Sequence, residues 1–416
     1  MYNAPTKYRE VLLMDIENAY ITLPSGFIAN GVHAGLKPNG NPDLAYIGSD
    51  RPANVAGVYT SNLVKGHSLT RSISLIKSRE TVRGIIINSG NANACVGEAG
   101  ESDASAMAEK AASLLGVSAD EILTASTGVI GSRLPLDKIT SAMPGLIGNA
   151  SSSEECGHLA ERAIMTTDTQ PKEVAATVSI FGKEITIAAI AKGSGMIHPN
   201  LATMISVFTT DANIKQDVLQ SMISDNVKDT YNRVSVDGDT SVCDMVVIMA
   251  NGASETPEIT MGSEEYETFK DAFHALCFDL AKMIASDGEG ASKLVEVEVV
   301  GAKTAKDAYL CVLAICRSPL CKTAIFGQDA NCGRFITALG YSGADIDPDK
   351  ISMFLSGLPV YEKGVALPFD EDVAKEKLSE HDILIRVELN DGEYNDRMWT
   401  CDFTYDYVKI NASYRS

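Results

Sequence analysis

Long hydrophobic runs are missing from this 416-residue sequence, which has no stretch near the roughly 20 uncharged apolar residues that span a bilayer. Residues 1–15 also lack the apolar core of a signal peptide and carry charges at Lys7, Arg9 and Glu10, so we expect a cytoplasmic protein with no membrane partner. The sequence also has no run of basic residues. It contains 35 Lys and Arg residues against 55 Asp and Glu residues, which gives a formal net charge of −20. This balance argues against nucleic-acid binding, which requires a concentrated basic surface.

The usual metal and phosphate motifs are missing too. The nine cysteines include no C-x-x-C pair and the six histidines no helical pair, so we predict no metal site and expect reduced thiols. Cys311, Cys316 and Cys321 stand in an apolar setting that is typical of buried small side chains. Asp237-Gly238-Asp239 starts like a calcium loop but lacks the later Gly and Glu, and we interpret it as a turn. The sequence has no Walker loop, no dinucleotide-binding glycine motif and no G-x-S-x-G nucleophile elbow.

What the sequence does contain is an alternation of apolar strand-type runs with Ala-rich helical patterns, in a chain long enough for two or three structural units. We predict strands at residues 84–87, 121–125, 174–181, 184–191, 204–209, 245–250, 294–300 and 383–389. We predict helices at residues 102–115, 153–165, 216–229, 264–284 and 305–316, and a turn at Asn88-Ser89-Gly90. Paired strands stand between pairs of helices in this order, which favours a layered α/β (α+β) sandwich over a strictly alternating parallel sheet.

The most unusual segment runs from Lys192 to Met204 and reads K-G-S-G-M-I-H-P-N-L-A-T-M. A loop between two strands would explain it. A small residue, Ala202, before a Thr that opens a strand is also what an autoprocessing nucleophile requires. The Thr203 hydroxyl can attack the preceding carbonyl, and hydrolysis of the resulting ester leaves a free α-amine beside the same hydroxyl. An α-amine has a pKa of about 7.7–8.0, so it can act as general base for its own side chain.

Several motifs in a fixed order carry a resemblance to one family. They are the 192–204 segment, Asn88-Ser89-Gly90-Asn91-Ala92-Asn93-Ala94-Cys95, Ser126-Thr127-Gly128-Val129-Ile130-Gly131, Thr166-Thr167-Asp168-Thr169, Asp237-Gly238-Asp239-Thr240-Ser241 and Gly327-Gln328-Asp329-Ala330-Asn331. From about residue 15 to the C-terminus the chain resembles the glutamate N-acetyltransferase family of arginine biosynthesis, also called the ornithine acetyltransferase or ArgJ family. The resemblance implies a DmpA/ArgJ-like fold with mixed sheets between helical layers. It also implies self-cleavage into an α chain, 1–202, and a β chain, 203–416, which co-fold into one catalytic unit.

The resemblance assigns roles to individual residues. It implies cleavage between Ala202 and Thr203, Thr203 as the nucleophile, and Thr127 with Gly128 as the oxyanion hole. The substrate-binding residues that it implies are Thr166, Lys192, Thr203, Glu289, Asn411 and Ser416. Thr167, adjacent to Thr166, stays open as the alternative ligand. A Lys ammonium and Thr hydroxyls suit an α-carboxylate, and Glu289 suits the ornithine ammonium.

The activity implied is ping-pong transfer of an acetyl group from N2-acetyl-L-ornithine to L-glutamate through an acetyl-threonine, without an external cofactor. Whether acetyl-CoA also serves as donor is left open, because the sequence shows no recognisable CoA-phosphate loop. The partners expected are these small-molecule amino acids and a second copy, giving two α and two β chains. The chain departs from the family pattern at His198, Cys243, Cys332 and Ser416.

Two other functions remain as alternatives. An autoprocessed N-terminal-nucleophile aminopeptidase of related fold would use the same Thr amine but pass the acyl group to water. The side chains implied for substrate binding fit amino-acid substrates instead, namely Lys192, Glu289, Asn411 and Ser416. A non-catalytic α/β binding protein would keep the Thr203 segment as an uncut loop.

Overall fold

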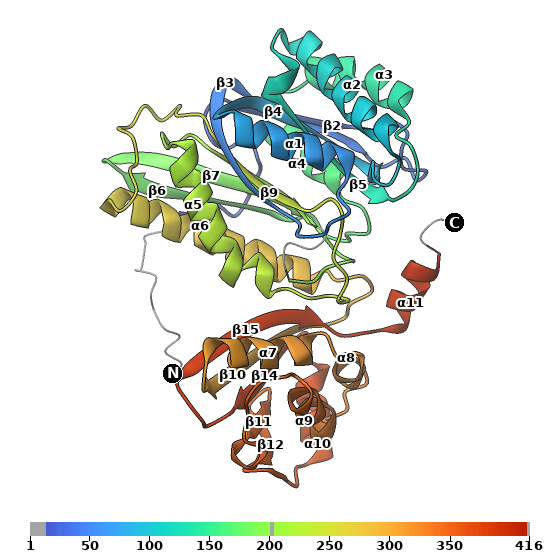
Figure 1. The fold of residues 1–416 in the computed structure, drawn as a ribbon, viewed down its shortest axis with the longest axis vertical. Helices are drawn as coiled ribbons and strands as arrows, with labels where there is room; N and C mark the ends of the chain where they lie inside the picture. Colours follow the sequence, from blue (N-terminus) through green and yellow to red (C-terminus); the bar gives the residue numbers. More distant parts are fainter. Residues whose placement is uncertain (1–13, 200–203, 414–416) are drawn as a thin grey trace. The chain divides into compact units, whose positions relative to one another are not determined.

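The fold is that of a computed structural model, in which residues 14–199 and 204–413 are described (Figure 1). The predictions at Ala202, Thr203 and Ser416 lie outside the described residues. The chain divides into two compact units. Unit 1 comprises Met1–Gly193, Asn200–Asn232 and Thr240–Leu280, and unit 2 comprises Ser194–Pro199, Arg233–Asp239 and Ala281–Ser416. Both contain a mixed sheet with helices packed on it, so the predicted layered α/β class is confirmed.

The sheet of unit 1 has the strand order β1-β6-β7-β8-β9-β3-β4-β5, with β2 paired to β3. Its strands are β1 (Met14–Asp15), β2 (Phe27–Val32), β3 (Leu44–Tyr59), β4 (Thr81–Asn91), β5 (Ile122–Val129), β6 (Glu173–Ile180), β7 (Lys183–Lys192), β8 (Ile205–Thr210) and β9 (Met245–Ala250). The pairs β4–β5 and β8–β9 are parallel and the others are antiparallel. The sheet is therefore mixed, as predicted.

Helices cover both faces of this sheet. They are α1 (His67–Ser78), α2 (Glu98–Leu115), α3 (Leu136–Gly148), α4 (Glu154–Ile164), α5 (Gln216–Asp229) and α6 (Glu264–Ser286). The run Ile85-Ile86-Ile87 in β4 shows why: Ile86 packs in a cluster with α2 and α3, whereas Ile85 and Ile87 pack in a second cluster with α1 and α4. Successive strand side chains point to opposite faces, so a continuous apolar run requires cover on both. Each fully buried Ile contributes about 1.5–3 kcal/mol.

The sheet of unit 1 draws on sequence from both sides of residue 202. Strand β7 pairs with β8 in antiparallel register, with Lys192 opposite Ile205. Strand β9 in turn pairs with β8 on one side and with β3 on the other. The strands that follow residue 202 are thus inserted between strands that precede it.

Unit 2 has a six-stranded sheet in the order β13-β12-β11-β14-β10-β15. Its strands are β10 (Leu294–Ala302), β11 (Ser352–Leu355), β12 (Leu358–Glu362), β13 (Val365–Ala366), β14 (Asp382–Glu388) and β15 (Tyr394–Cys401), and its helices are α7 (Ala305–Cys316), α8 (Pro319–Phe326), α9 (Cys332–Gly340), α10 (Glu371–Ser379) and α11 (Tyr405–Ala412). Across the described residues of both units, short 3-10 helices lie at Ala119–Glu121, Tyr231–Arg233 and Pro348–Lys350. Cys311, Cys316 and Cys321 are buried in the core of this unit, as predicted.

The predicted elements agree with the structure best where the apolar pattern is unbroken. β9, α5 and α7 have the predicted bounds. The turn predicted at Asn88-Ser89-Gly90 is wrong, because β4 continues to Asn91. Ser89 and Gly90 pair there with Thr127 and Gly128 of β5, and the Asn88 side-chain amide donates to the carbonyl of Asn91 at 2.9 Å. Asn, Ser and Gly favour turns, but pairing with β5 keeps these three residues in β4.

In the part of the chain that the structure describes, no single helix is long and apolar enough to cross a membrane. The pair α7 and α8, bent by 56°, meets that criterion only when the two helices are taken together.

Candidate active site

Thr127 and Gly128, the predicted oxyanion-hole pair, lie near the end of β5. Thr127 is almost completely buried. Gly128 has φ +130, and a Cβ atom added to it would lie 2.4 Å from the carbonyl carbon of Gly90 and 2.6 Å from the amide nitrogen of Asn91. Only glycine tolerates both that backbone conformation and that approach. The two strands therefore hold the Thr127–Gly128 backbone in one defined position.

The end of β5 is connected to the segment before β9 by a small apolar cluster. This cluster contains Ala92, Ala94, Val242 and Cys243, with Ile130 packed against it. The Cys243 thiol donates to the carbonyl of Ala92 at 3.4 Å. Cys243, where the family pattern differs, is thus a buried packing residue here.

Asp244, the next residue, holds the start of β8. Its Oδ1 accepts the backbone N–H of Met204 at 3.0 Å, and its side chain is fully buried. Burial raises the pKa of this carboxyl well above its usual value, although the Met204 N–H and the Lys192 ammonium act in the opposite direction. Met204 directly follows the predicted nucleophile, so Asp244 fixes the chain one residue away from it. Sequence reasoning missed this residue.

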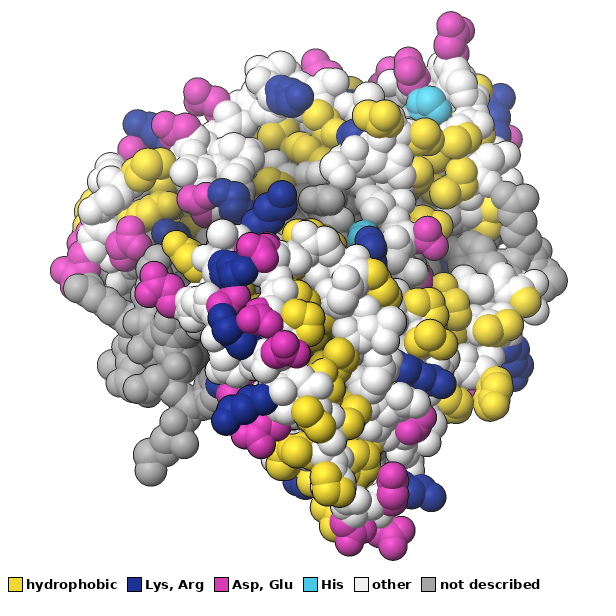
Figure 2. Space-filling view, turned by 60° about the horizontal axis from the view of Figure 1, so that its bottom comes forward, with side chains coloured by type: hydrophobic (Ala, Val, Ile, Leu, Met, Phe, Trp, Pro, Cys, Tyr) yellow, Lys and Arg dark blue, Asp and Glu magenta, His cyan; other side chains and the backbone are white. Residues whose placement is uncertain are grey.

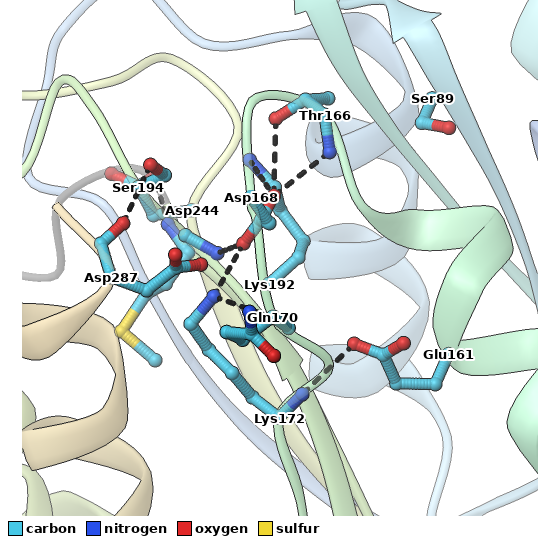
Figure 3. A network of polar contacts seen from close by, with 12 residues as sticks. Ser89, Glu161, Thr166, Asp168, Gln170, Lys172, Lys192, Ser194, Asp244 and Asp287 are labelled. Carbon is cyan, nitrogen blue, oxygen red and sulfur yellow. Dashed lines mark hydrogen bonds and ion pairs between the residues drawn. The ribbon is translucent and has the colours of Figure 1, made fainter. Parts of the chain in front are cut away.

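A buried cluster of charges surrounds two of the predicted substrate-binding residues (Figure 3). Asp168 lies at its centre, with the Lys172 Nζ 2.9 Å from Oδ1 and the Lys192 Nζ 4.0 Å from Oδ2. The backbone N–H of Thr166 donates to Oδ2 at 2.8 Å, and the Thr166 hydroxyl lies 3.5 Å from the same oxygen. The structure thus brings the predicted residues Thr166 and Lys192 to one carboxylate.

Burial and the neighbouring charges set the ionisation of the carboxyl groups in this cluster. Burial alone would raise the pKa of Asp168, but the ammonium groups of Lys172 and Lys192 and the Thr166 N–H together lower it below its usual range. Asp168 is therefore a carboxylate at neutral pH. Burial raises the pKa of the nearby Glu161 to about 8, so this side chain is mostly protonated. The ammonium groups of Lys172 and Lys192 therefore both face an ionised Asp168.

Glu289 and Asn411, predicted to bind substrate, also meet, in unit 2. The Asn411 side-chain amide donates to Glu289 Oε2 at 2.8 Å, which ties α11 to the loop that carries Glu289. The Glu289 carboxylate lies so close to Gly195 that a Cβ atom there would be 2.3 Å from its Oε2. The backbone N–H of Glu289 donates to the carbonyl of Ser194 at 2.9 Å. Gly195 therefore makes room for this carboxylate.

The turn predicted at Asp237-Gly238-Asp239 is confirmed, and it has a structural task within unit 2. The Asp237 carboxylate accepts the backbone N–H groups of Met196 at 2.6 Å and Ile197 at 3.0 Å. It also accepts the N–H of Asp239 at 3.2 Å. All three bonds go to one side chain, so the Asp237 carboxylate holds residues 196–197 against this segment.

The remaining His, Cys, Asp, Glu, Lys and Arg side chains are dispersed over the described structure. Among residues 14–199 and 204–413, no group of three or more His, Cys, Asp or Glu side chains could hold a metal ion. All nine cysteines are free thiols. On the face drawn in Figure 2, the described Lys and Arg side chains lie among Asp and Glu side chains rather than in a continuous basic patch.

Comparisons with known proteins agree with the motifs. The ArgJ family model matches residues 28–416. The arginine biosynthesis bifunctional protein ArgJ of Caldanaerobacter subterraneus subsp. tengcongensis is 46% identical over 407 residues, which cover 97% of this chain and 100% of that protein. The ArgJ protein of Oceanobacillus iheyensis is 44% identical over 411 residues, covering 99% of each chain.

Two solved structures are also similar. ArgJ from Bacillus halodurans shares 36% identity with a TM-score of 0.44 and covers 46% of this chain and 99% of its own. The ornithine acetyltransferase of Mycobacterium tuberculosis, solved in complex with ornithine, shares 37% identity with a TM-score of 0.43 and covers 45% of this chain and 98% of its own.

The two mixed sheets and their helices define a layered α/β protein with a buried cluster of charged side chains. The matches in sequence over nearly the whole chain then show that it belongs to the ArgJ family. The prediction of an acetyltransferase enzyme of this family is confirmed by that membership.

Proposed function

We propose that the chain transfers the acetyl group of N2-acetyl-L-ornithine to L-glutamate by a ping-pong mechanism, giving L-ornithine and N-acetyl-L-glutamate. The observation that supports this proposal is the buried Lys192 side chain, which lies with Thr166 at Asp168, 4.0 Å from that carboxylate. Both substrates have an α-carboxylate, and a buried ammonium group binds such an anion strongly because little water competes for either charge.

The proposed chemistry needs no external cofactor. Thr203 Oγ, deprotonated by its own α-amine, attacks the acetyl carbonyl of N-acetylornithine, and ornithine leaves with its amine protonated. Thr127 and Gly128 stabilise the negative charge that develops on the carbonyl oxygen. The glutamate amine then attacks the acetyl-Thr203 ester, which regenerates the hydroxyl. Glu289 supplies the negative charge that suits the side-chain ammonium of ornithine.

Maturation is the first test of this proposal. We expect the purified protein to contain two fragments, 1–202 and 203–416, with Thr203 as a new N-terminus in intact-mass and N-terminal sequence measurements. Thr203→Ala should give one uncut chain, whereas Thr203→Ser keeps a hydroxyl and should still cut, more slowly. A Thr203→Ala chain that splits at the same bond would show that Thr203 is not the nucleophile for cleavage.

Acetyl transfer is tested on the cut enzyme. N-acetylornithine alone should add one acetyl group to the fragment that begins at Thr203, and glutamate should remove it as N-acetylglutamate. Steady release of acetate without glutamate would favour the aminopeptidase-like alternative, in which water is the acceptor. An uncut chain with no acetylation would favour the non-catalytic binding protein. Replacing N-acetylornithine with acetyl-CoA decides whether acetyl-CoA is a second donor.

A further inference from the structure

One face of helix α11 lies along the loop that carries Glu289, within unit 2. Residues three, four and seven positions apart share a face of a helix. Thr404, Tyr407 and Asn411 have this spacing, with Thr404 as the N-cap residue. The Thr404 hydroxyl donates to the carbonyl of Gly290 at 2.6 Å, and the Asn411 side-chain amide donates to Glu289 Oε2 at 2.8 Å. The two ends of this face therefore contact two successive residues of the loop.

Gly290 allows the loop and the helix to approach each other closely. It has φ +68, and a Cβ atom added to it would lie 2.5 Å from the amide nitrogen of Tyr407 and 2.8 Å from the carbonyl carbon of Asp406. A larger residue would collide with the backbone of the first turn of α11. The loop therefore packs against this turn backbone to backbone, at the residue next to Glu289.

The position of α11 depends on such contacts, because none of its side chains is buried. Tyr407 stacks on Phe403, with ring centroids 4.8 Å apart, and Tyr405 meets Phe326 edge-on at 5.5 Å. The Tyr407 hydroxyl also hydrogen-bonds Asp237. Ring pairs tolerate centroid separations of about 4.5–7 Å, whereas a hydrogen bond fixes its two heavy atoms within a few tenths of an ångström. The bond from the N-cap hydroxyl is the one that fixes the helix to the backbone of the loop.

Other hydrogen bonds hold the loop on either side of that contact. The Asp402 carboxylate, which is almost completely buried, accepts the backbone N–H groups of Ser292 at 2.8 Å and Lys293 at 3.1 Å. The backbone N–H of Glu289 donates to the carbonyl of Ser194 at 2.9 Å. The loop is thereby fixed before and after the carbonyl that the N-cap hydroxyl binds.

We propose that Thr404 is a positioning residue that sets the preference of the site for acetyl donors with a cationic side chain. Its hydroxyl makes two bonds at once: it accepts the N–H of Asp406 at 3.1 Å as the helix cap, and it donates to the Gly290 carbonyl. It thus holds α11 and the loop in one register, and it keeps the Glu289 carboxylate where Asn411 orients it. This inference rests on the proposed function, in which Glu289 meets the ornithine ammonium.

The test compares the KM for N2-acetyl-L-ornithine with the inhibition constant of N2-acetyl-L-norleucine, in which a methyl group replaces the side-chain ammonium. We expect Thr404→Val to raise KM for N-acetylornithine about 3–10-fold, the loss expected when one hydrogen bond no longer holds Glu289 in place. The inhibition constant of the norleucine compound should change little. Turnover should also change little, because Glu289 binds the ammonium equally in the ground state and the transition state. Thr404→Ser keeps the hydroxyl and should keep the preference.

Thr404→Asp separates the bond to the loop from the helix cap. Aspartate caps a helix at least as well as threonine, but its ionised side chain cannot donate to the Gly290 carbonyl. Its negative charge would strengthen the binding of a cationic donor, so a loss of preference in this variant cannot come from charge. We expect Thr404→Asp to lose the preference, as Thr404→Val does. If it keeps the preference, only the cap matters and the positioning role is overturned.

Glu289→Gln shows through which residue Thr404 acts. Thermal melting of the cut enzyme establishes that each variant is folded, and Thr404→Ala replaces Thr404→Val if the latter does not fold. In a Glu289→Gln background, Thr404→Val should have no further effect on the preference. If Thr404→Val raises both constants equally, Thr404 acts on the fold and the positioning role is overturned, whereas the acetyl-transfer function stands. If Glu289→Gln alone keeps the full preference for the cationic donor, Glu289 does not bind the ammonium, and that part of the proposed function fails together with this inference.

Discussion

Gly128→Ala is the substitution whose cost the structure defines best. The added Cβ atom would lie 2.4 Å from the carbonyl carbon of Gly90 and 2.6 Å from the amide nitrogen of Asn91, at φ +130. Both neighbours belong to β4, whose backbone pairs with β5. The clash cannot be relieved by a side-chain rotation, so one of the two strands must shift.

The expected loss of stability follows from three contributions. An alanine held at this φ costs about 1–3 kcal/mol. Moving a packed backbone to admit an extra methyl group costs about 1–3 kcal/mol more. Alanine also lowers the conformational entropy of the unfolded chain, which offsets about 0.4–1 kcal/mol of this loss of stability. The sum is a loss of about 1–6 kcal/mol, or roughly 2–12 °C in Tm at about 2 °C per kcal/mol.

Gly131→Ala is the matched control, because Gly131 also has a positive φ, +81, but has nothing within 4 Å of its added Cβ. It should lose only the backbone contribution, about 0–2.6 kcal/mol after the entropy gain, and so less than Gly128→Ala by the cost of moving β4. Differential scanning calorimetry of both variants measures the difference, and an acetyl-transfer assay measures turnover. Turnover should fall in Gly128→Ala, because the amide that we assign to the oxyanion hole moves with the strand.

Equal Tm values for the two variants, with unchanged turnover in Gly128→Ala, would refute this reasoning. That result would mean that β4 shifts without a loss in the free energy of unfolding, and that the Gly128 backbone has no part in catalysis.

Three further predictions concern catalysis, assembly and pH. Thr127→Ala should lower turnover by about 10²–10³-fold if its hydroxyl is one oxyanion donor, measured on fully cut enzyme under conditions where chemistry is rate-limiting; unchanged transfer would show a wrong assignment. Light scattering should give roughly twice the precursor mass, for two α and two β chains, and a stable particle of one of each would contradict this. Glu161 has a folded-state pKa of about 8 against a usual 4.5, so the folded state holds a proton that the unfolded chain releases, and stability should fall as pH rises through this window. Glu161→Gln should flatten the decline in Tm, and an unchanged pH dependence would exclude Glu161 as its source.

The sequence predicts most reliably the elements whose pattern is decided locally. Gln216–Asp229 and Ala305–Cys316 show an unbroken helical period, and the structure has both as predicted. The long strand β3 was missed because Asp50, Arg51 and Pro52 interrupt its apolar pattern. These three residues are exposed at a register shift between Gly48 and Ala53, where the strand is not paired regularly with β4.

The candidate site, too, was predicted only in part from the sequence. The motif resemblance supplied Thr166 and Lys192, and the structure places both at Asp168. The resemblance did not identify Asp168 as a site residue, and it did not include Lys172. Their contacts join separate loops and strands, so only the folded structure shows them. Asp244 was missed for the same reason: only the fold shows that its carboxyl accepts the N–H of Met204.

The insertion of β8 and β9 among strands that precede residue 202 has a consequence for how the mature enzyme is made and lost. Before cleavage, the chain folds as one molecule, and every strand of the sheet reaches its partner at a rate independent of concentration. After cleavage at the proposed bond, an unfolded molecule is two separate chains, and refolding depends on their meeting in solution. If the chain is cut at the proposed bond, its lifetime would depend on slow unfolding rather than on efficient refolding, and we expect folding to precede cleavage.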